Sequence, residues 1–191
     1  MTKQVTKAEI RARCESQSVE HKRSLADLRQ ACEALCGMVN TDAARGIVLF
    51  GIGPDGNVCG VEPGNLDTAQ RTLAQHIRDK FAPPLLCDIE VLDCEGAHIV
   101  AVEATRSPVV SFHEYDGRAF LREGTSKRLL SFEEKRQVDS RRNRDRHNGP
   151  WRCDRCGTYC GMLSIVEATA DGPKKSYQCS CGGEFWPATA T

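Results

Sequence analysis

The sequence has no long apolar run and no excess of charge of either sign. Its 191 residues contain no stretch of about eighteen apolar residues, which argues against a membrane-spanning helix. The first residues, MTKQVTKAEIRARC, lack the apolar core of an export signal, so we expect a cytoplasmic protein with no membrane partner. Basic and acidic residues number 26 each, so any affinity for a polyanion must come from local patches.

Aromatic residues are scarce, at 6% of the chain, whereas cysteine is abundant, with eleven residues. An odd count without an export signal argues against a disulfide framework. Cys32, Cys36 and Cys87 have apolar neighbours, as small core residues do. Four of the remaining cysteines form two closely spaced pairs near the C-terminal end, which are Cys153 with Cys156 and Cys179 with Cys181.

These two pairs predict a structural zinc site in a small ribbon. Zinc prefers four soft ligands in a tetrahedron, and each short pair supplies two thiolates to one side of it. A segment of about forty residues needs such a metal, because it cannot bury a sufficient apolar core. Four protein ligands leave no open position for water, so the site is expected to be structural. Free cysteines or a redox pair are the alternatives, and Cys160 and His147 are competing ligands.

Residues 7–138 alternate between strand and helix patterns and predict one α/β domain with a mixed sheet and flanking helices. Apolar residues recur at helical spacing in 25–39 and in 66–81, whereas 47–52 is a continuous apolar run typical of a buried central strand. Further helices are expected at 7–14 and from 132 towards 140, and further strands at 19–23, 58–61, 88–92, 98–104 and 118–122.

Residues 139–150 contain four arginines and no apolar residue except a proline, so we expect a basic linker or a frayed helix end. This segment would precede the zinc ribbon, at 151–191. A second basic group flanks a loop near residue 124. The candidate nucleic-acid contacts are therefore Arg122, Lys127 and Arg128 at the loop, and Arg141, Arg142 and Arg144 in the linker. For each of them taken singly, a solvated charge is the alternative.

Three carboxylates and a lysine form a candidate catalytic cluster. Glu15 and Glu20 converge only if Glu15 ends a helix and Glu20 opens a strand after a bend. Asp55 follows the central strand in a Pro-Asp-Gly-Asn turn. Such oxygen ligands suit Mg²⁺ or Mn²⁺, and Lys22, on the same strand face as Glu20, would bind a phosphate. Spacing alone favours the alternative, in which Asp55 only shapes a turn and the others are surface charges.

The sequence resembles the Schlafen-type AlbA domain over about residues 10–138. The resemblance is carried by Glu15 to Lys22, Asn40-Thr41, Phe50 to Gly60 and Arg122 to Ser126. These segments are similar to the family motifs E-S-x-x-x-E-F-K, A-x-x-N-T, G-x-D-D-x-G-x-x-x-G and R-x-G-S-S/T. His21 replaces the usual phenylalanine, and Pro54-Asp55 replaces a pair that is commonly acidic. In catalytically active members, the positions of Glu15, Glu20 and Asp55 form a ribonuclease site.

The resemblance implies an α/β AlbA-like domain, followed here by a zinc ribbon, that acts on RNA or single-stranded nucleic acid. The first hypothesis is a metal-dependent endoribonuclease acting on structured or single-stranded, tRNA-like or rRNA-like RNA. One alternative is a non-catalytic DNA- or RNA-binding or transcription-regulatory module. Another is an adaptor that recruits a protein partner through the ribbon. Schlafen cores combine two such domains, so a single copy also predicts a homodimer.

Overall fold

The computed structural model describes the backbone of residues 3–147, 151–153, 155, 159–160, 167–169, 172–174 and 185–187. Side chains are described for residues 3–142 and for Arg155. The chain divides into two compact units, Met1–Lys135 and Arg136–Thr191.

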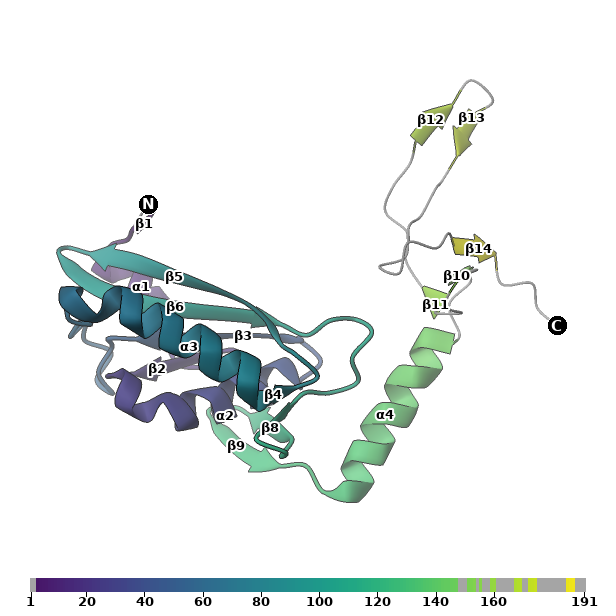
Figure 1. The fold of residues 1–191 in the computed structure, drawn as a ribbon, viewed down its shortest axis with the longest axis horizontal. Helices are drawn as coiled ribbons and strands as arrows, with labels where there is room; N and C mark the ends of the chain where they lie inside the picture. The colour runs from purple at the N-terminus through teal and green to yellow at the C-terminus, as the bar shows by residue number, and fades with distance from the viewer. Residues whose placement is uncertain are drawn as a thin grey trace. The chain divides into compact units, whose positions relative to one another are not determined.

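A five-stranded mixed sheet with the order β1-β5-β6-β3-β2 forms the centre of the first unit (Figure 1). Strands β5 (Leu86–Cys94) and β6 (Ala97–Thr105) are a long antiparallel hairpin. Strand β3 (Arg45–Phe50) pairs antiparallel with β6, and β2 (Val19–Lys22) pairs parallel with β3. The short β1 (Lys3–Gln4) lies parallel to β5 at the opposite edge. Strand β2 is therefore an edge strand, next to the central β3.

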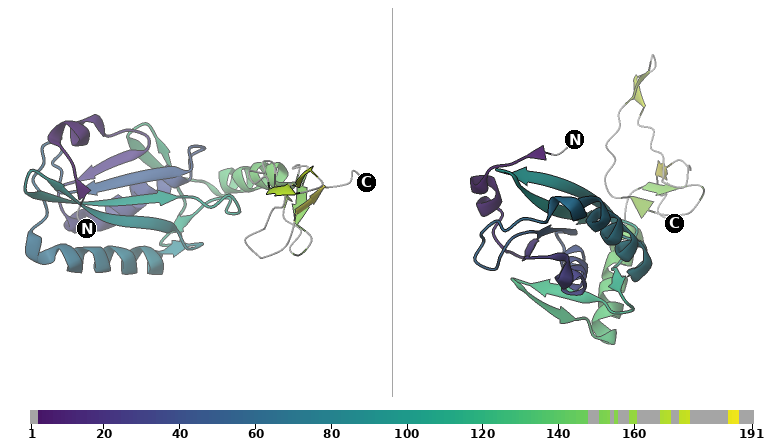
Figure 2. Two further views of the ribbon diagram at one scale, coloured as in Figure 1. Left: turned by 90° about the horizontal axis from the view of Figure 1, so that it is seen from above. Right: turned by 60° about the vertical axis from the view of Figure 1, so that its left-hand side comes forward.

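Helices cover both faces of this sheet. Helices α2 (Leu28–Val39) and α3 (Leu66–Lys80) pack on one face, and α1 (Lys7–Ala12) packs on the other (Figure 2). Their apolar side chains form two cores, one containing Leu35, Phe50, Leu73 and Val102, and the other containing Ile10, Leu49, Leu92 and Ile99. This arrangement confirms the predicted α/β class, with a mixed sheet between flanking helices.

Helix α2 is held at both ends by polar contacts. It follows a 3-10 turn, η1 (Leu25–Asp27), whose first residues are capped by the Ser24 hydroxyl. At the other end, the buried Asn40 side chain donates to the carbonyls of His113 at 2.8 Å and Phe120 at 2.9 Å. Its Oδ1 accepts from the backbone N–H of His113 at 2.8 Å. One buried amide thus joins the end of α2 to two later segments, with its hydrogen-bonding groups satisfied.

Two short antiparallel pairs complete the first unit. Strand β4 (Phe81–Ala82) pairs with β7 (Glu114–Tyr115), and β8 (Phe120–Glu123) pairs with β9 (Ser126–Leu129). Both β7 and β8 contact α2, so they pack beside the helix rather than extending the central sheet.

Helix α4 (Phe132–His147) begins with a reciprocal cap. The Ser131 hydroxyl accepts from the N–H of Glu134 at 3.2 Å, and the Glu134 carboxylate accepts from the N–H of Ser131 at 2.8 Å. The helix includes residues 139–147, which were expected to be a basic linker or a frayed helix end. In the described part of the chain, no helix is long and apolar enough to cross a membrane.

The described strands of the second unit form two small antiparallel sheets. Strand β10 (Trp151–Cys153) lies between β11 (Tyr159–Cys160) and β14 (Phe185–Pro187). Strands β12 (Glu167–Thr169) and β13 (Gly172–Lys174) pair as a hairpin.

Candidate functional site

The Glu20 carboxylate, on β2, is held between two cations. Its Oε1 lies 2.7 Å from Nζ of Lys22, and its Oε2 lies 2.7 Å from Nη2 of Arg122. The exposed side-chain fractions are 12% for Glu20, 15% for Lys22 and 1% for Arg122. The Glu20–Lys22 contact follows from strand geometry, because alternate residues of a strand share a face. The negative charge predicted to bind a metal is therefore neutralised within the protein.

Arg122, on β8, is a buried cation that joins several segments. Its Nε donates to the carbonyls of Ser16 at 3.0 Å and Gly124 at 3.2 Å, and its Nη2 donates to the carbonyl of Val19 at 3.4 Å. A buried guanidinium is costly unless it is paired, and here the Glu20 carboxylate and three carbonyls satisfy it. In this structure the charge of Arg122 is engaged within the protein, and its contact with a phosphate stays a prediction.

The other two candidate acidic ligands also have partners. Oε1 of Glu15 accepts from the backbone N–H of His21 at 3.1 Å, which closes the bend between α1 and β2. Oδ1 of Asp55 accepts from the N–H of Asn57 at 3.1 Å, and its Oδ2 accepts from the Asn57 side chain at 2.6 Å. These backbone and side-chain hydrogen bonds lower the pKa of Asp55. Both carboxylates thus shape the turns in which they lie.

These contacts determine whether the three carboxylates fit a divalent cation. Mg²⁺ requires several oxygen ligands directed at one point. Among the side chains that the structure describes, no group of three or more His, Cys, Asp or Glu is placed to hold a metal ion. A metal at Glu20 would also have to displace Lys22 and Arg122 from its oxygens. As arranged here, Glu15, Glu20 and Asp55 do not fit Mg²⁺ or Mn²⁺. The divalent metal of the first hypothesis is therefore left as an untested prediction.

The glycine-rich segment after β3 brings the chain back beside the end of β2. The N–H groups of Gly51 and Ile52 both donate to the carbonyl of Lys22, at 2.8 and 3.1 Å. Gly51 has a φ of +99°, and a Cβ there would lie 3.1 Å from backbone atoms of Gly60. Both the left-handed conformation and the close approach require glycine at position 51.

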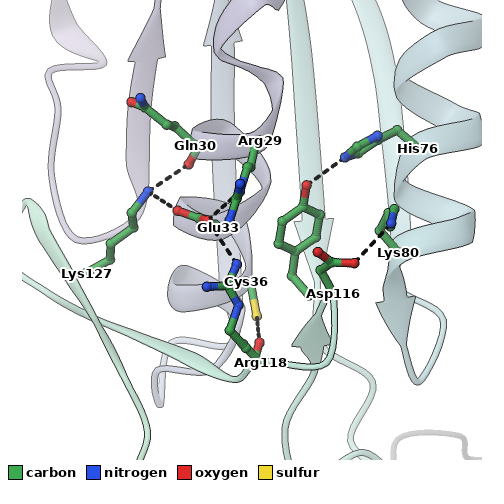
Figure 3. A network of polar contacts seen from close by, with 10 residues as sticks. Arg29, Gln30, Glu33, Cys36, His76, Lys80, Asp116, Arg118 and Lys127 are labelled. Carbon is green, nitrogen blue, oxygen red and sulfur yellow. Dashed lines mark hydrogen bonds and ion pairs between the residues drawn. The ribbon is translucent and has the colours of Figure 1, made fainter.

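A second charge cluster centres on Glu33 of α2 (Figure 3). Its carboxylate lies 2.8 Å from Lys127, 3.3 Å from Arg29 and 3.6 Å from Arg118. Burial alone would raise the pKa of Glu33, but the ion pairs with Lys127 and Arg29 outweigh it and lower the pKa. Lys127 also donates to the carbonyl of Gln30 at 3.3 Å. In this structure, the charge of Lys127 holds β9 against α2.

The remaining candidate phosphate contacts lie on β9 and α4. Arg128 is 40% exposed and pairs with Glu123 and Glu134, each at 2.8 Å. On α4, Arg141 is exposed and Arg142 is half-buried. Arg144 also lies on α4, but its side chain is outside the described ones. Their contact with nucleic acid stays a prediction.

The predicted zinc ligands lie in the second unit. Cys153 is the last residue of β10, and its side chain is not among the described ones, whereas Cys156, Cys179 and Cys181 lie outside the described residues. Strand β10 pairs antiparallel with β14, so that Cys153 is opposite Phe185. The zinc prediction rests on the cysteine spacing together with this pairing.

An open pocket of about 470 Å³ lies beside the end of β2, and the sequence did not indicate it. Its lining comes from residues 23–25 and 60–72, which are separated in the sequence. These segments meet only because β2 pairs with β3 and the chain then turns back at Gly51. Gly60 ends the motif at residues 50–60, but apart from it no motif in either segment indicated the pocket.

The sequence was compared with protein families and with known proteins and structures. A family model described as Schlafen, AlbA_2 matches residues 15–131. The DIP2311 protein from Corynebacterium diphtheriae is similar in structure, with a TM-score of 0.50 and 16% identity, over 85% of this chain. That match spans 30% of the Corynebacterium protein, and it is a likeness of fold. The N-terminal domain of a RecG-related protein from Nitrosomonas europaea matches with a TM-score of 0.45 and 21% identity, over 66% of this chain and 92% of that domain. No curated protein matches the sequence.

Proposed function

Because the family model covers more than half of its length, the chain belongs to the Schlafen AlbA_2 family, and we propose that its AlbA_2 domain is a non-catalytic module that binds RNA or single-stranded nucleic acid. The family relationship supports the association with nucleic acid. One observation supports the absence of cleavage, namely that Lys22 and the buried Arg122 neutralise the Glu20 carboxylate. In this proposal, the residues resembling a nuclease site hold the fold together.

The proposal is tested by incubating the full chain with labelled tRNA, single-stranded RNA and single-stranded DNA, with and without added Mg²⁺ or Mn²⁺. The matched variant is Glu15→Gln, because a change at Glu20 would also leave Arg122 buried without its partner. Omitting the divalent ion is preferable to adding a chelator, which would also remove any zinc from the second unit.

We expect the strands to bind and to remain intact under every metal condition. Metal-dependent products that disappear in Glu15→Gln, at an unchanged melting temperature, would instead establish the endoribonuclease of the first hypothesis. A chain that neither binds nor cuts any strand would refute the proposal and favour the protein-interaction adaptor. The homodimer stays a prediction, which light scattering of the full chain would test.

The cysteine pairs of the second unit are proposed to hold one structural zinc ion, with Cys153, Cys156, Cys179 and Cys181 as ligands. In an antiparallel pair, the end of one strand lies beside the start of the other. The first cysteine pair begins where β10 ends, and the second pair precedes β14 in the sequence. This pairing supports convergence of the four thiolates at one end of the small sheet.

Elemental analysis tests the zinc site, with an expected content of about one zinc ion per chain. Cys181→Ser should lose the metal, whereas Cys160→Ser should retain it. Cys160 is the control because it pairs with Trp151, at the end of β10 away from Cys153. Zinc lost equally from both variants would assign the ligands differently, and a metal-free wild type would refute the site.

A further inference from the structure

We infer that the open pocket beside the end of β2 receives one nucleotide of a bound single strand. This inference rests on the proposed nucleic-acid binding and gives that binding a location. The pocket has a volume of about 470 Å³. Sites for small ligands usually enclose about 300–1,000 Å³, so the pocket is of a size for one nucleotide. It is lined by Arg23, Ser24, Leu25, Gly60, Val61, Glu62, Asn65, Thr68, Ala69 and Thr72.

The apolar part of the lining suits the plane of a base. Leu25 comes from the turn after β2, Val61 from the segment after the glycine-rich loop, and Ala69 from the first turns of α3. Leu25 and Val61 are partly buried and pack against the core that contains Leu35 and Phe50. Contacts with that core therefore hold the apolar surface of the pocket in place. Aliphatic side chains can pack against the face of a base without reading its hydrogen-bonding edge, as the apolar walls of ligand sites do.

Exposed polar side chains line the same pocket. Within the described part of the chain, the guanidinium of Arg23 makes no hydrogen bond or ion pair, unlike those of Arg122 and Arg128, although its charge helps to lower the pKa of Asp55. The hydroxyls of Thr68 and Thr72 are one helical turn apart on α3, and they too have no hydrogen-bond partner among the described residues. A cation can contact a phosphate, and hydroxyls can contact a base edge or a ribose.

The single acidic side chain in the lining gives the nucleotide a direction. Glu62 lies on the wall formed by residues 60–72, and its Oε2 accepts from the Asn65 side chain at 3.4 Å. Arg23 lies on the opposing wall, formed by residues 23–25. A phosphate is repelled by Glu62 and attracted by Arg23, so it should lie at the Arg23 wall, with the base towards α3.

Two variants of the full chain test this inference by fluorescence anisotropy with short single-stranded RNA and DNA. Arg23→Gln removes the cation from the pocket lining, and Thr72→Trp fills the pocket. Both positions are exposed, so neither change disturbs the core. Arg78→Gln is the matched control for the loss of one cation, and Gln75→Trp is the matched control for a neutral side chain replaced by tryptophan, because both are exposed positions of α3 outside the pocket.

We expect each pocket variant to weaken binding about tenfold, and each control to stay within about twofold of the wild type. Arg23→Gln should also lower the slope of log affinity against log salt by about one, as expected for a lost phosphate contact. Thr72→Trp should leave that slope unchanged, because it removes no charge.

A second measurement separates the failure of this inference from failure of the proposed function. Nuclear magnetic resonance spectra of the labelled chain are recorded with adenosine and cytidine 5′-monophosphate, following the amides of Ser24, Thr68 and Thr72. Strand binding that neither pocket variant weakens would overturn the pocket assignment and leave the proposed function standing. Absence of strand binding, with mononucleotide shifts at these amides, would overturn both and indicate a free nucleotide as the ligand. No binding and no shifts would also overturn both.

Discussion

Replacing Arg122 with methionine should strongly destabilise the first unit, although the new side chain is apolar and similar in length. The change removes the ion pair with Glu20 at 2.7 Å and the hydrogen bonds to the carbonyls of Ser16, Gly124 and Val19. Glu20 would then keep Lys22 as its remaining charged partner, while only 12% of its side chain is exposed.

Breaking one side of a buried ion pair typically costs about 3–5 kcal/mol, because the remaining charge stays buried without its partner. Lys22 still compensates Glu20 in part, so we expect a loss of about 3 kcal/mol in the free energy of unfolding. A domain of this size has about 5–15 kcal/mol in total, so the variant should fold with a reduced margin. Adding Glu20→Gln to Arg122→Met should recover part of the loss, because the stranded carboxylate is removed.

The assay is urea unfolding followed by far-ultraviolet circular dichroism, which reports the helices of the first unit. Tryptophan fluorescence is unsuitable because both tryptophans, Trp151 and Trp186, lie in the second unit. Arg128→Met is the control, since the Arg128 ion pairs are exposed and their loss should change stability much less. An Arg122→Met variant as stable as this control, or one destabilised further by Glu20→Gln, would refute the reasoning.

Three further predictions concern other parts of the first unit. Gly51→Ala should cost about 2 kcal/mol or more in urea unfolding, and Gly56→Ala about 1 kcal/mol, because both have positive φ but only Gly51 lacks room for a Cβ. The pKa of Glu33 is lower in the folded chain than in the unfolded chain. The Glu33 carboxylate therefore stabilises the fold at pH values above its unfolded-state pKa, and this stabilisation is lost as the pH falls through its folded-state pKa. Glu33→Gln should therefore flatten the acid limb of a stability–pH profile, and an unchanged limb would contradict the ion-pair cluster. Burial raises the pKa of Cys36 to about 12, so mass spectrometry should find it unalkylated in the native chain, whereas the exposed Cys14 should react.

The sequence predicted the longer elements because their patterns extend over many residues. Helix α2 was recognisable from its apolar periodicity, and β3 from its continuous apolar run. Strands β1, β4 and β7 have two residues each and no pattern of their own, so only their pairing partners define them. Residues 58–61 were expected to be a strand, but Val58 and Val61 form only isolated bridges, because the neighbouring N–H groups donate back to Gly51.

The candidate site was predictable only as far as local geometry determines it. The shared strand face of Glu20 and Lys22 follows from the two-residue period, and the structure has them in contact. The burial of Arg122 could not be foreseen, because its carbonyl partners Ser16 and Val19 are 106 and 103 residues away in the sequence. Its charged neighbours suggested an exposed basic loop, whereas tertiary packing made it the partner of Glu20.

The pairing of Glu20 with Arg122 bears on whether the glutamate of the family's sequence signature indicates nuclease activity. Each residue stabilises the other across segments that meet only in the folded chain. Breaking one side of such a buried pair is costly to folding, whether or not the chain cleaves a phosphodiester bond. In this chain the glutamate of the signature therefore has a role in folding, and its presence does not by itself diagnose an enzyme.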